Sequence, residues 1–342
     1  MAINIGSLAL QACKKGTTNV KAIYKGDTLI WPIFKYGTWT NMGSFSSNSR
    51  ENFGFGSSDE NTVYLYCGTS GYSASSVTQA VYKYVSSTNT YSMSTSWLNN
   101  QQVQACVMVK NSTASGNEAS FLVFGGMPNT SANLTDAVNK VTAVLVQTMN
   151  ISPRDTMPQA KQVLGAASIY TGSAIHTFGG YYTTFLSEHY RYTQGSGTWT
   201  SLASLPQAMN ALSCVTDETG GGIYIVGGQT SAGAQNYFRY WNEVTQTYVT
   251  LPSMPDKRKQ HRVIYDPDKQ YIYVIGGENA NSTATDTVFE YHIKEAKWYT
   301  NTNCPTTLSI HGLHRDGNGN IYTLFGRNAS KGSVTNIYKY VP

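Results

Sequence analysis

Short runs of consecutive apolar residues that end in glycine recur along this chain. The clearest are Ile-Tyr-Ile-Val-Gly-Gly at 223–228 and Ile-Tyr-Val-Ile-Gly-Gly at 272–277. Because β-branched and aromatic residues follow one another without polar alternation, these runs predict strands that are buried on both faces. The paired glycines allow the backbone to turn sharply and to pass close to other strands. Weaker copies of the run end at four further glycines: Gly68, Gly126, Gly180 and Gly326.

Each copy is followed by further elements in a constant order. An aromatic, strand-like run comes about ten residues after the glycines, and another aromatic residue follows that run. The aromatic runs occupy 81–84, 189–192, 237–240, 288–291 and 337–340. The later aromatic residues are Tyr91, Trp199, Tyr248 and Trp298. Since consecutive copies lie about 50 residues apart, the repeat has the length of a β-propeller blade.

The order of glycine doublet, spaced tyrosine and tryptophan resembles the Kelch repeat, and the resemblance extends from about residue 34 to residue 342. Six copies predict an all-β fold, a six-bladed Kelch-like β-propeller. The second copy departs from the pattern, because the apolar stretch 141–146 stands where an aromatic strand is expected and no tryptophan follows it.

The last copy supplies three strands and lacks the fourth. Residues 36–42 have a composition similar to that of 197–202, which end the third copy. We therefore predict that residues 34–42 form the outer strand of the last blade. Such pairing joins the two ends of the propeller and removes the open edges of a partial ring. On this interpretation the propeller comprises residues 34–342.

Residues 1–33 do not belong to the repeat. The stretch 3–10 alternates in part and predicts a strand. The runs 19–24 and 28–31 flank Lys25-Gly26-Asp27, which predicts a hairpin turn. Three short strands cannot bury enough surface to fold independently. The segment is therefore expected to need a partner, either the propeller or another protein.

The stretch 19–32, with its Tyr-x-Gly-Asp-x-x-x-Trp run, resembles a module near the ends of virion proteins in tailed phages of Bacteroidetes, including crAss-like phages. The resemblance implies a virion protein, made in the host bacterial cytoplasm and present in multiple copies in a tail, baseplate or appendage. It implies docking of residues 1–33 to other virion proteins. The docking residues would be Tyr24, Asp27, Leu29 and Trp31. The alternative is a hairpin packed on the propeller.

Composition and charge give no indication of a nucleic acid or a membrane as the partner. Charged residues make up 13% of the 342 residues, and Tyr (25) and Gly (31) are abundant, which fits an all-β protein rich in turns. The net charge of +5 is modest, and its densest cluster, Lys257-Arg258-Lys259, is too short to indicate nucleic acid. No apolar run approaches the length of a membrane span. Five scattered cysteines without metal spacing predict reduced thiols.

No motif in the sequence indicates catalysis, a metal or a cofactor. His311 and His314 are the closest histidine pair, and three residues apart on a strand they point to opposite faces, which is poor geometry for one metal. Asp316-Gly-Asn-Gly-Asn320 and two similar stretches before strands read as hairpin turns, not calcium loops. There is no nucleophile elbow or P-loop. We therefore expect a protein that is not an enzyme.

The alternative is a carbohydrate-active Kelch enzyme, similar to a sialic acid epimerase, with a basic and acidic cluster at its centre. The residues that could form such a cluster are Arg50, Glu51, Arg258, His261, Glu278, Arg327 and His311.

In Kelch propellers the loops after the glycine doublets and the blade linkers share one face, which usually holds the ligand. Here these loops are rich in tyrosine and amides, which suit sugars or protein surfaces because flat rings and neutral donors have a small desolvation cost. The predicted ligand-binding residues are Tyr72, Asn129, Tyr181, Tyr182, Gln229, Glu278, Asn279, Arg327, Arg50, Arg258 and His311. The expected ligand is another virion protein or a host-surface polysaccharide. The alternative is that these are merely solvated loops.

Overall fold

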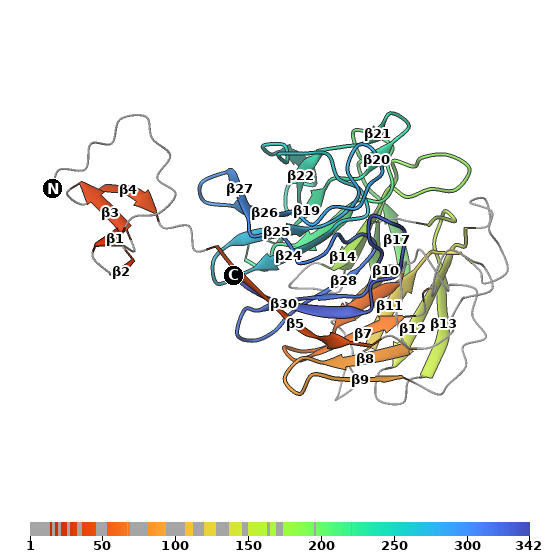
Figure 1. Ribbon diagram of the computed structural model, residues 1–342. Coiled ribbons are helices and arrows are strands. Elements are labelled where there is room, and N and C mark those ends of the chain that lie inside the picture. The colour runs from red at the N-terminus through yellow and green to blue at the C-terminus, as the bar shows by residue number, and fades with distance from the viewer. Residues whose placement is uncertain are drawn as a thin grey trace. The chain divides into compact units, whose positions relative to one another are not determined.

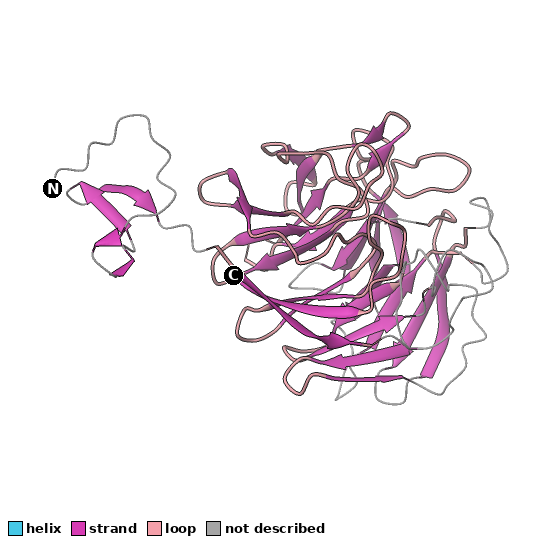
Figure 2. Cartoon of the chain, in the orientation of Figure 1, coloured by secondary structure: helices cyan, strands magenta, loops and turns pink. Residues whose placement is uncertain are grey.

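The predicted all-β fold is confirmed by a computed structural model, in which the described residues form strands, turns and loops and no helix (Figure 2). The structure describes residues 14–15, 18–19, 22–25, 28–32, 36–45, 53–66, 68, 81–93, 107–111, 120–127, 137–145, 150–162, 165–168, 174–194, 196–219 and 221–342. The chain divides into two compact units, Met1–Gly37 and Thr38–Pro342.

The second unit is a propeller of six four-stranded antiparallel sheets, as predicted. Blade 1 contains β6 (Gly54–Ser57), β7 (Thr62–Tyr66), β8 (Val81–Val85) and β9 (Thr90–Met93). Blade 2 contains β10 (Val107–Asn111), β11 (Ser120–Phe124), β12 (Lys140–Leu145) and β13 (Asn150–Thr156). Blade 3 contains β14 (Gly165–Ser168), β15 (Ala174–Phe178), β16 (His189–Thr193) and β17 (Thr198–Ser201).

The remaining three blades follow the same plan. Blade 4 contains β18 (Ser213–Thr216), β19 (Gly222–Val226), β22 (Phe238–Asn242) and β23 (Thr247–Thr250). Its loop adds the small pair β20 (Gln229–Thr230) and β21 (Gly233–Ala234). Blade 5 contains β24 (Arg262–Asp266), β25 (Tyr271–Ile275), β26 (Val288–His292) and β27 (Lys297–Asn301). Blade 6 contains β28 (Gly312–Arg315), β29 (Ile321–Leu324), β30 (Asn336–Val341) and β5 (Thr38–Ser44).

The six first strands close a ring. Each contacts the first strand of the next blade, and β28 of blade 6 contacts β6 of blade 1. In Figure 1 the first strands β10, β14, β24 and β28 lie toward the middle of the propeller. The second strands carry the repeated apolar runs, and β7 and β19 are buried along their whole length. Apolar side chains on both faces of these strands fill the space between adjacent blades, as their sequence predicts.

The glycine doublets follow these strands because the backbone there has a left-handed conformation. At Gly276 φ is +61°, and a Cβ atom would meet the carbonyl oxygen of Leu308 in the linker to blade 6. Both the dihedral angle and the close approach of a second backbone favour glycine at this position.

The predicted closure of the ring is confirmed, with the strand at 38–44 in place of 34–42. β5 pairs with β30, and Trp39 lies opposite Tyr340, their ring centroids 4.8 Å apart. The Trp39 indole N–H also donates a hydrogen bond to the carbonyl oxygen of Thr302, 3.1 Å away. A register shift between Ile337 and Tyr338 carries the pairing on to Ser44, which explains the later end of the strand.

Blade 2 keeps the common architecture despite its unusual sequence. Its third strand, β12, covers most of the apolar stretch 141–146, and Val141 and Val144 are buried. The fold therefore accepts aliphatic residues where the other blades have aromatic ones, since both fill the space between blades.

The first unit contains two small strand pairs. β1 (Lys14–Lys15) pairs with β2 (Thr18–Asn19), and β3 (Ala22–Lys25) pairs with β4 (Thr28–Pro32) as the predicted hairpin. In this hairpin Tyr24 lies opposite Leu29, and Ile23 lies opposite Trp31. Asp27 and the strand predicted at 3–10 lie outside the described residues.

Candidate functional site

One backbone contact recurs in blades 3 to 6 and places the predicted loops beside the blade linkers. The residue after the glycine doublet, or after Gly326 in blade 6, forms an antiparallel bridge with a residue of the preceding linker. The bridged pairs are Gln162 with Tyr181, Asn210 with Gln229, Lys259 with Glu278, and Ser309 with Arg327. In each pair the two residues exchange N–H···O=C hydrogen bonds of 2.8–3.0 Å. We call these eight residues the bridge positions. Four predicted site residues, Tyr181, Gln229, Glu278 and Arg327, thus occupy equivalent positions in consecutive blades.

Blades 5 and 6 bring three charged side chains together at the bridge positions. The Arg327 guanidinium donates a 2.8 Å hydrogen bond to Glu278 Oε1, and Lys259 Nζ lies 3.6 Å from Glu278 Oε2. The side chains are only 12% (Lys259), 9% (Glu278) and 10% (Arg327) exposed. We call this cluster the charged triad. It holds two cations around one carboxylate, and its low exposure strengthens the interaction between these charges.

Tyrosine side chains dominate the corresponding loop of blade 3. Tyr181 and Tyr182 are both half-buried. The Tyr181 hydroxyl donates to the carbonyl oxygen of Thr183 at 3.3 Å, and its ring meets the edge of Phe185 at a centroid distance of 5.4 Å. Tyr181 is thereby held in place by its own loop, which makes it a preorganised aromatic surface.

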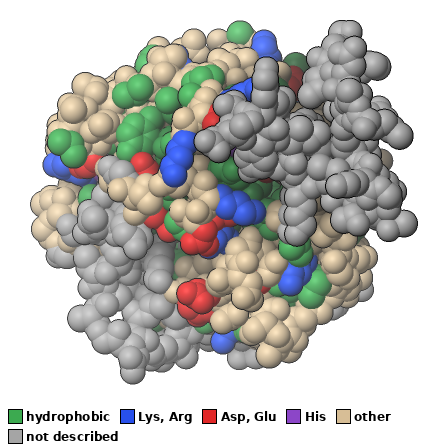
Figure 3. All heavy atoms as spheres, turned by 90° about the vertical axis from the view of Figure 1, so that its left-hand side faces the viewer, with side chains coloured by type: hydrophobic (Ala, Val, Ile, Leu, Met, Phe, Trp, Pro, Cys, Tyr) green, Lys and Arg blue, Asp and Glu red, His purple; other side chains and the backbone are tan. Residues whose placement is uncertain are grey.

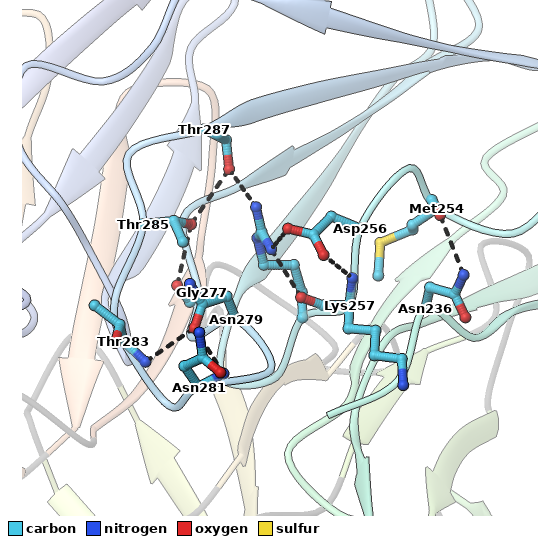
Figure 4. Close-up of polar contacts among 11 residues, drawn as sticks. Asn236, Met254, Asp256, Lys257, Gly277, Asn279, Asn281, Thr283, Thr285 and Thr287 are labelled. Carbon is cyan, nitrogen blue, oxygen red and sulfur yellow. Dashed lines mark hydrogen bonds and ion pairs between the residues drawn. The ribbon is translucent and has the colours of Figure 1, made fainter. Parts of the chain in front are cut away.

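The predicted ligand-binding role of Arg258 is not supported by its position. Its side chain is 2% exposed and donates hydrogen bonds to Asp256 (2.6 Å) and to Thr287 Oγ1 (2.8 Å). Figure 4 shows Asp256 and Thr287 converging from the linker and from blade 5. The guanidinium also lies 5.3 Å from the centroid of the Phe289 ring. Arg258 therefore fastens the linker to blade 5.

His311 is likewise a packing residue in this structure. A Cβ atom on Gly326 would touch the Cα and Cβ atoms of His311, and Gly277 has the same relation to His261. Leu212 occupies the equivalent position against Gly228 in blade 4. Burial lowers the pKa of His261 to about 3 and that of His311 well below its usual range. Both imidazoles are therefore neutral and inaccessible, and neither fits the predicted surface or an acid–base cluster.

Asn279 is used within its own loop. Its side-chain oxygen accepts hydrogen bonds from the backbone N–H groups of Asn281 (2.9 Å) and Thr283 (3.2 Å), as Figure 4 shows. Gln229 is half-buried. Tyr72, Asn129 and Arg50 lie outside the described residues, as does Glu51.

The structure assigns contacts to two lysines that were not among the predicted site residues. Lys259, noted in the sequence only as part of a short basic cluster, belongs to the charged triad. An alignment of the linkers on their bridge positions could have found it. Lys161 is fully buried, with Nζ 5.0 Å from the centroid of the Tyr190 ring, and burial lowers its pKa to about 8 despite the opposing charge of Glu188. Lys161 precedes its bridge position as Arg258 does, and it fills the same place between linker and blade.

The turns between first and second strands carry acidic residues. Arg315 Nη2 forms ion pairs with Asp266 (3.0 Å) and Asp268 (2.6 Å) of the neighbouring blade. Figure 3, viewed from the side where β30 ends, shows acidic side chains beside basic ones near the middle of the described surface. Asp316 Oδ1 accepts hydrogen bonds from the backbone N–H groups of Asn318 and Asn320, which confirms the hairpin turn predicted there. Among the described residues no group of three or more His, Cys, Asp or Glu side chains could hold a metal ion.

Comparison with known proteins supports the class that the fold defines. Residues 268–301, from the turn after β24 to the end of β27, match the Kelch motif. The chain is thus a six-bladed β-propeller with a Kelch motif in blade 5. No curated protein matches the chain. The described residues include no helix that is long and apolar enough to cross a membrane.

Proposed function

We propose that this chain is a binding protein whose ligand contacts the bridge positions and the loops beside them. One observation carries the proposal. The same backbone bridge recurs in four blades, while its side chains vary among tyrosine, amides, hydroxyl and charged groups. A rigid and repeated backbone with unlike side chains is a suitable scaffold for recognition, because the scaffold needs no rearrangement to present them. The ligand would be another virion protein or a host-surface glycan.

We propose further that residues 1–33 dock the propeller to a phage particle, as a component of the tail, baseplate or an appendage. Two observations support this. The stretch 19–32 resembles the attachment module of Bacteroidetes phage virion proteins, and Met1–Gly37 is a compact unit separate from the propeller. On this proposal Tyr24, Asp27, Leu29 and Trp31 provide the docking contacts.

Docking is tested by deleting residues 1–33. The shortened chain should remain folded, with an unchanged circular dichroism spectrum, but should be missing from assembled particles. Trp31→Ala in the full chain should reduce its amount in the particle, whereas Tyr36→Ala, at a tyrosine just outside the segment, should not. Undiminished incorporation of the shortened chain would refute the docking role.

Glycan binding is tested on an array of host polysaccharides. The full-length protein should bind, and the double variant Tyr181→Ala, Tyr182→Ala should lose binding because two aromatic surfaces disappear. Tyr36→Ala removes a tyrosine that is 64% exposed elsewhere and serves as the control. An array on which the wild type binds nothing would indicate a ligand that is protein only.

One assay tests the alternative function, that of a carbohydrate-active enzyme. Incubation with sialic acids and host polysaccharide should leave both unchanged. Product formation that Glu278→Gln abolishes would replace the binding proposal with the enzymatic one.

A further inference from the structure

The charged triad is not needed by the fold. Blades 3 and 4 form the same backbone bridge with Gln162 and Tyr181, and with Asn210 and Gln229. Moving charged groups out of water is costly even when they pair, so a neutral pair would serve folding at least as well. Three largely buried charges at a position where neighbouring blades have none therefore indicate a role in binding.

The triad has an excess of positive charge and an incompletely paired lysine. Two cations surround one carboxylate, which leaves one net positive charge. Among the described residues, the partner of the Lys259 ammonium is Glu278 at 3.6 Å, an ion pair that is too long for a hydrogen bond. Arg262, three residues after Lys259, donates a 2.7 Å hydrogen bond to the carbonyl oxygen of His311. The net positive charge of the triad favours an anionic ligand.

Two side-chain acceptors in the linkers before blades 4 and 5 lack partners among the described residues. Asn210 Oδ1 and Gln260 Oε1 are buried and have no hydrogen-bond partner in the part of the chain that the structure describes. Gln260 follows Lys259 in the linker before blade 5. Its N–H donates a 3.0 Å hydrogen bond to the carbonyl oxygen of Ala211, so the linker that carries Asn210 lies against the linker that carries Lys259. Buried acceptors without partners are costly, and a ligand with hydroxyl groups would satisfy them.

We propose that the charged triad, with Asn210 and Gln260, is a subsite for a sugar that carries a carboxylate. Lys259 and Arg327 bind the carboxylate, while Glu278 and the two amide oxygens accept hydrogen bonds from hydroxyl groups. This assignment rests on the proposed binding role of the bridge positions. An acidic peptide would satisfy the cations but would offer few hydroxyl groups to the three acceptors, so the sugar fits better.

The test is calorimetric titration of the full-length protein with oligosaccharides of glucuronic acid, galacturonic acid and sialic acid. Each is compared with its carboxyl-reduced form, which keeps the hydroxyl groups and loses the charge. At least one acidic form should bind, its reduced form should bind about 10- to 100-fold more weakly, and added salt should weaken binding of the acidic form.

Matched variants test whether the residues of the charged triad bind the sugar. Lys259→Gln should reduce affinity for the acidic sugar by a similar factor and leave the reduced form unaffected. Lys257→Gln removes the same charge from an exposed position two residues earlier and should change neither. Glu278→Gln should weaken binding of both forms, since an acceptor for hydroxyl groups is lost. Melting temperatures of all variants establish that they are folded.

The possible failures separate the subsite from the wider proposal. Equal affinity for acidic and reduced sugars, with binding still lost in the Tyr181→Ala, Tyr182→Ala variant, overturns the subsite and retains the glycan-binding face. Absence of binding to all three acidic sugars also overturns it. Tight, Lys259-dependent binding of a polyglutamate peptide without sugar binding assigns the triad to a protein partner instead.

Discussion

At the scale of single residues, the repeat is conserved within the chain where backbone geometry demands it and varies where it does not. The doublet glycines of blades 2 to 5 all have positive φ. The next residue exchanges backbone hydrogen bonds with the linker, which places no demand on its side chain. Tyr181, Gln229, Glu278 and Arg327 therefore differ without any change in the bridge. Blade geometry and the proposed ligand recognition are thus assigned to adjacent residues.

Because backbone geometry requires glycine in the doublet, we predict that a substitution there strongly destabilises the fold. Gly276→Ala should lower the free energy of unfolding by about 3 kcal/mol, because a left-handed alanine and a clash with the Leu308 carbonyl oxygen add together. Gly221→Ala is the matched control, since φ is +70° and nothing lies within 4 Å of the added methyl group. It should cost about 1 kcal/mol. Denaturant unfolding measures both, and equal losses would contradict the role given to the close contact.

At the scale of elements, five blades are each built from a single segment of the chain and one from strands at opposite ends of the propeller. β5 covers the edge of β30, and Trp39 packs against Tyr340. Without β5, β30 would be an open edge strand with unpaired backbone groups. The closing strand therefore stabilises blade 6 and also the contact of blade 6 with blade 1.

We expect this strand to be essential and the unit before it dispensable for folding. A chain that starts at residue 38 should melt like the full-length protein. A chain that starts at residue 46 should melt about 5 °C lower or more, and should aggregate through the exposed edge of β30. Differential scanning calorimetry and light scattering give the two readouts. Unchanged melting of the shorter chain would show that blade 6 is stable with three strands.

At the scale of the whole propeller, stability depends on packing between neighbouring blades. One apolar cluster combines Val63 and Tyr84 of blade 1 with Tyr322 and Leu324 of blade 6. Buried histidines lie in the same kind of environment. Burial lowers the pKa of His176 to about 4, of His189 to about 2 and of His314 to about 4, in addition to His261 and His311. The folded propeller thus holds several imidazoles neutral at pH values where an unfolded chain would protonate them.

This arrangement predicts a loss of stability in mild acid. An unfolded histidine has a pKa near 6.5, so between about pH 6.5 and pH 3 the unfolded state binds more protons than the folded state at His261. Stability is therefore complete above pH 6.5 and falls as the pH is lowered. His261→Leu should reduce the slope of unfolding free energy against pH by about one proton in this range.

Urea unfolding from pH 7.5 to pH 4 measures this difference. Carboxylates titrate in both proteins and cancel from the comparison. His261→Leu should be nearly as stable as the wild type at pH 7.5, because Leu212 occupies the equivalent position in blade 4. Identical slopes for the two proteins would show that His261 does not contribute to the loss.

Local patterns in the sequence were sufficient for the architecture. Runs such as 223–228 and 272–277 repeat at the period of a blade, so strand order, blade number and the closing strand near Trp39 were all predictable. These features depend on backbone preferences and on apolar residues that must be buried, and both can be read along the chain. The aliphatic third strand of blade 2 could be placed only by its position in the repeat.

The side chains that meet at the bridge positions could not be obtained in this way. Arg258, Lys259 and His261 lie within four residues of one another, yet one fastens a linker, one joins the charged triad and one packs on a glycine doublet. Which of these roles a residue has depends on contacts with blades 5 and 6, some 20 to 70 residues further along the chain. Repetition therefore specified the propeller and the loops that follow its glycine doublets. The pairing of Glu278 with Arg327 and Lys259 arose only when adjacent blades packed together, because long-range contacts decide which charges are buried and what they face.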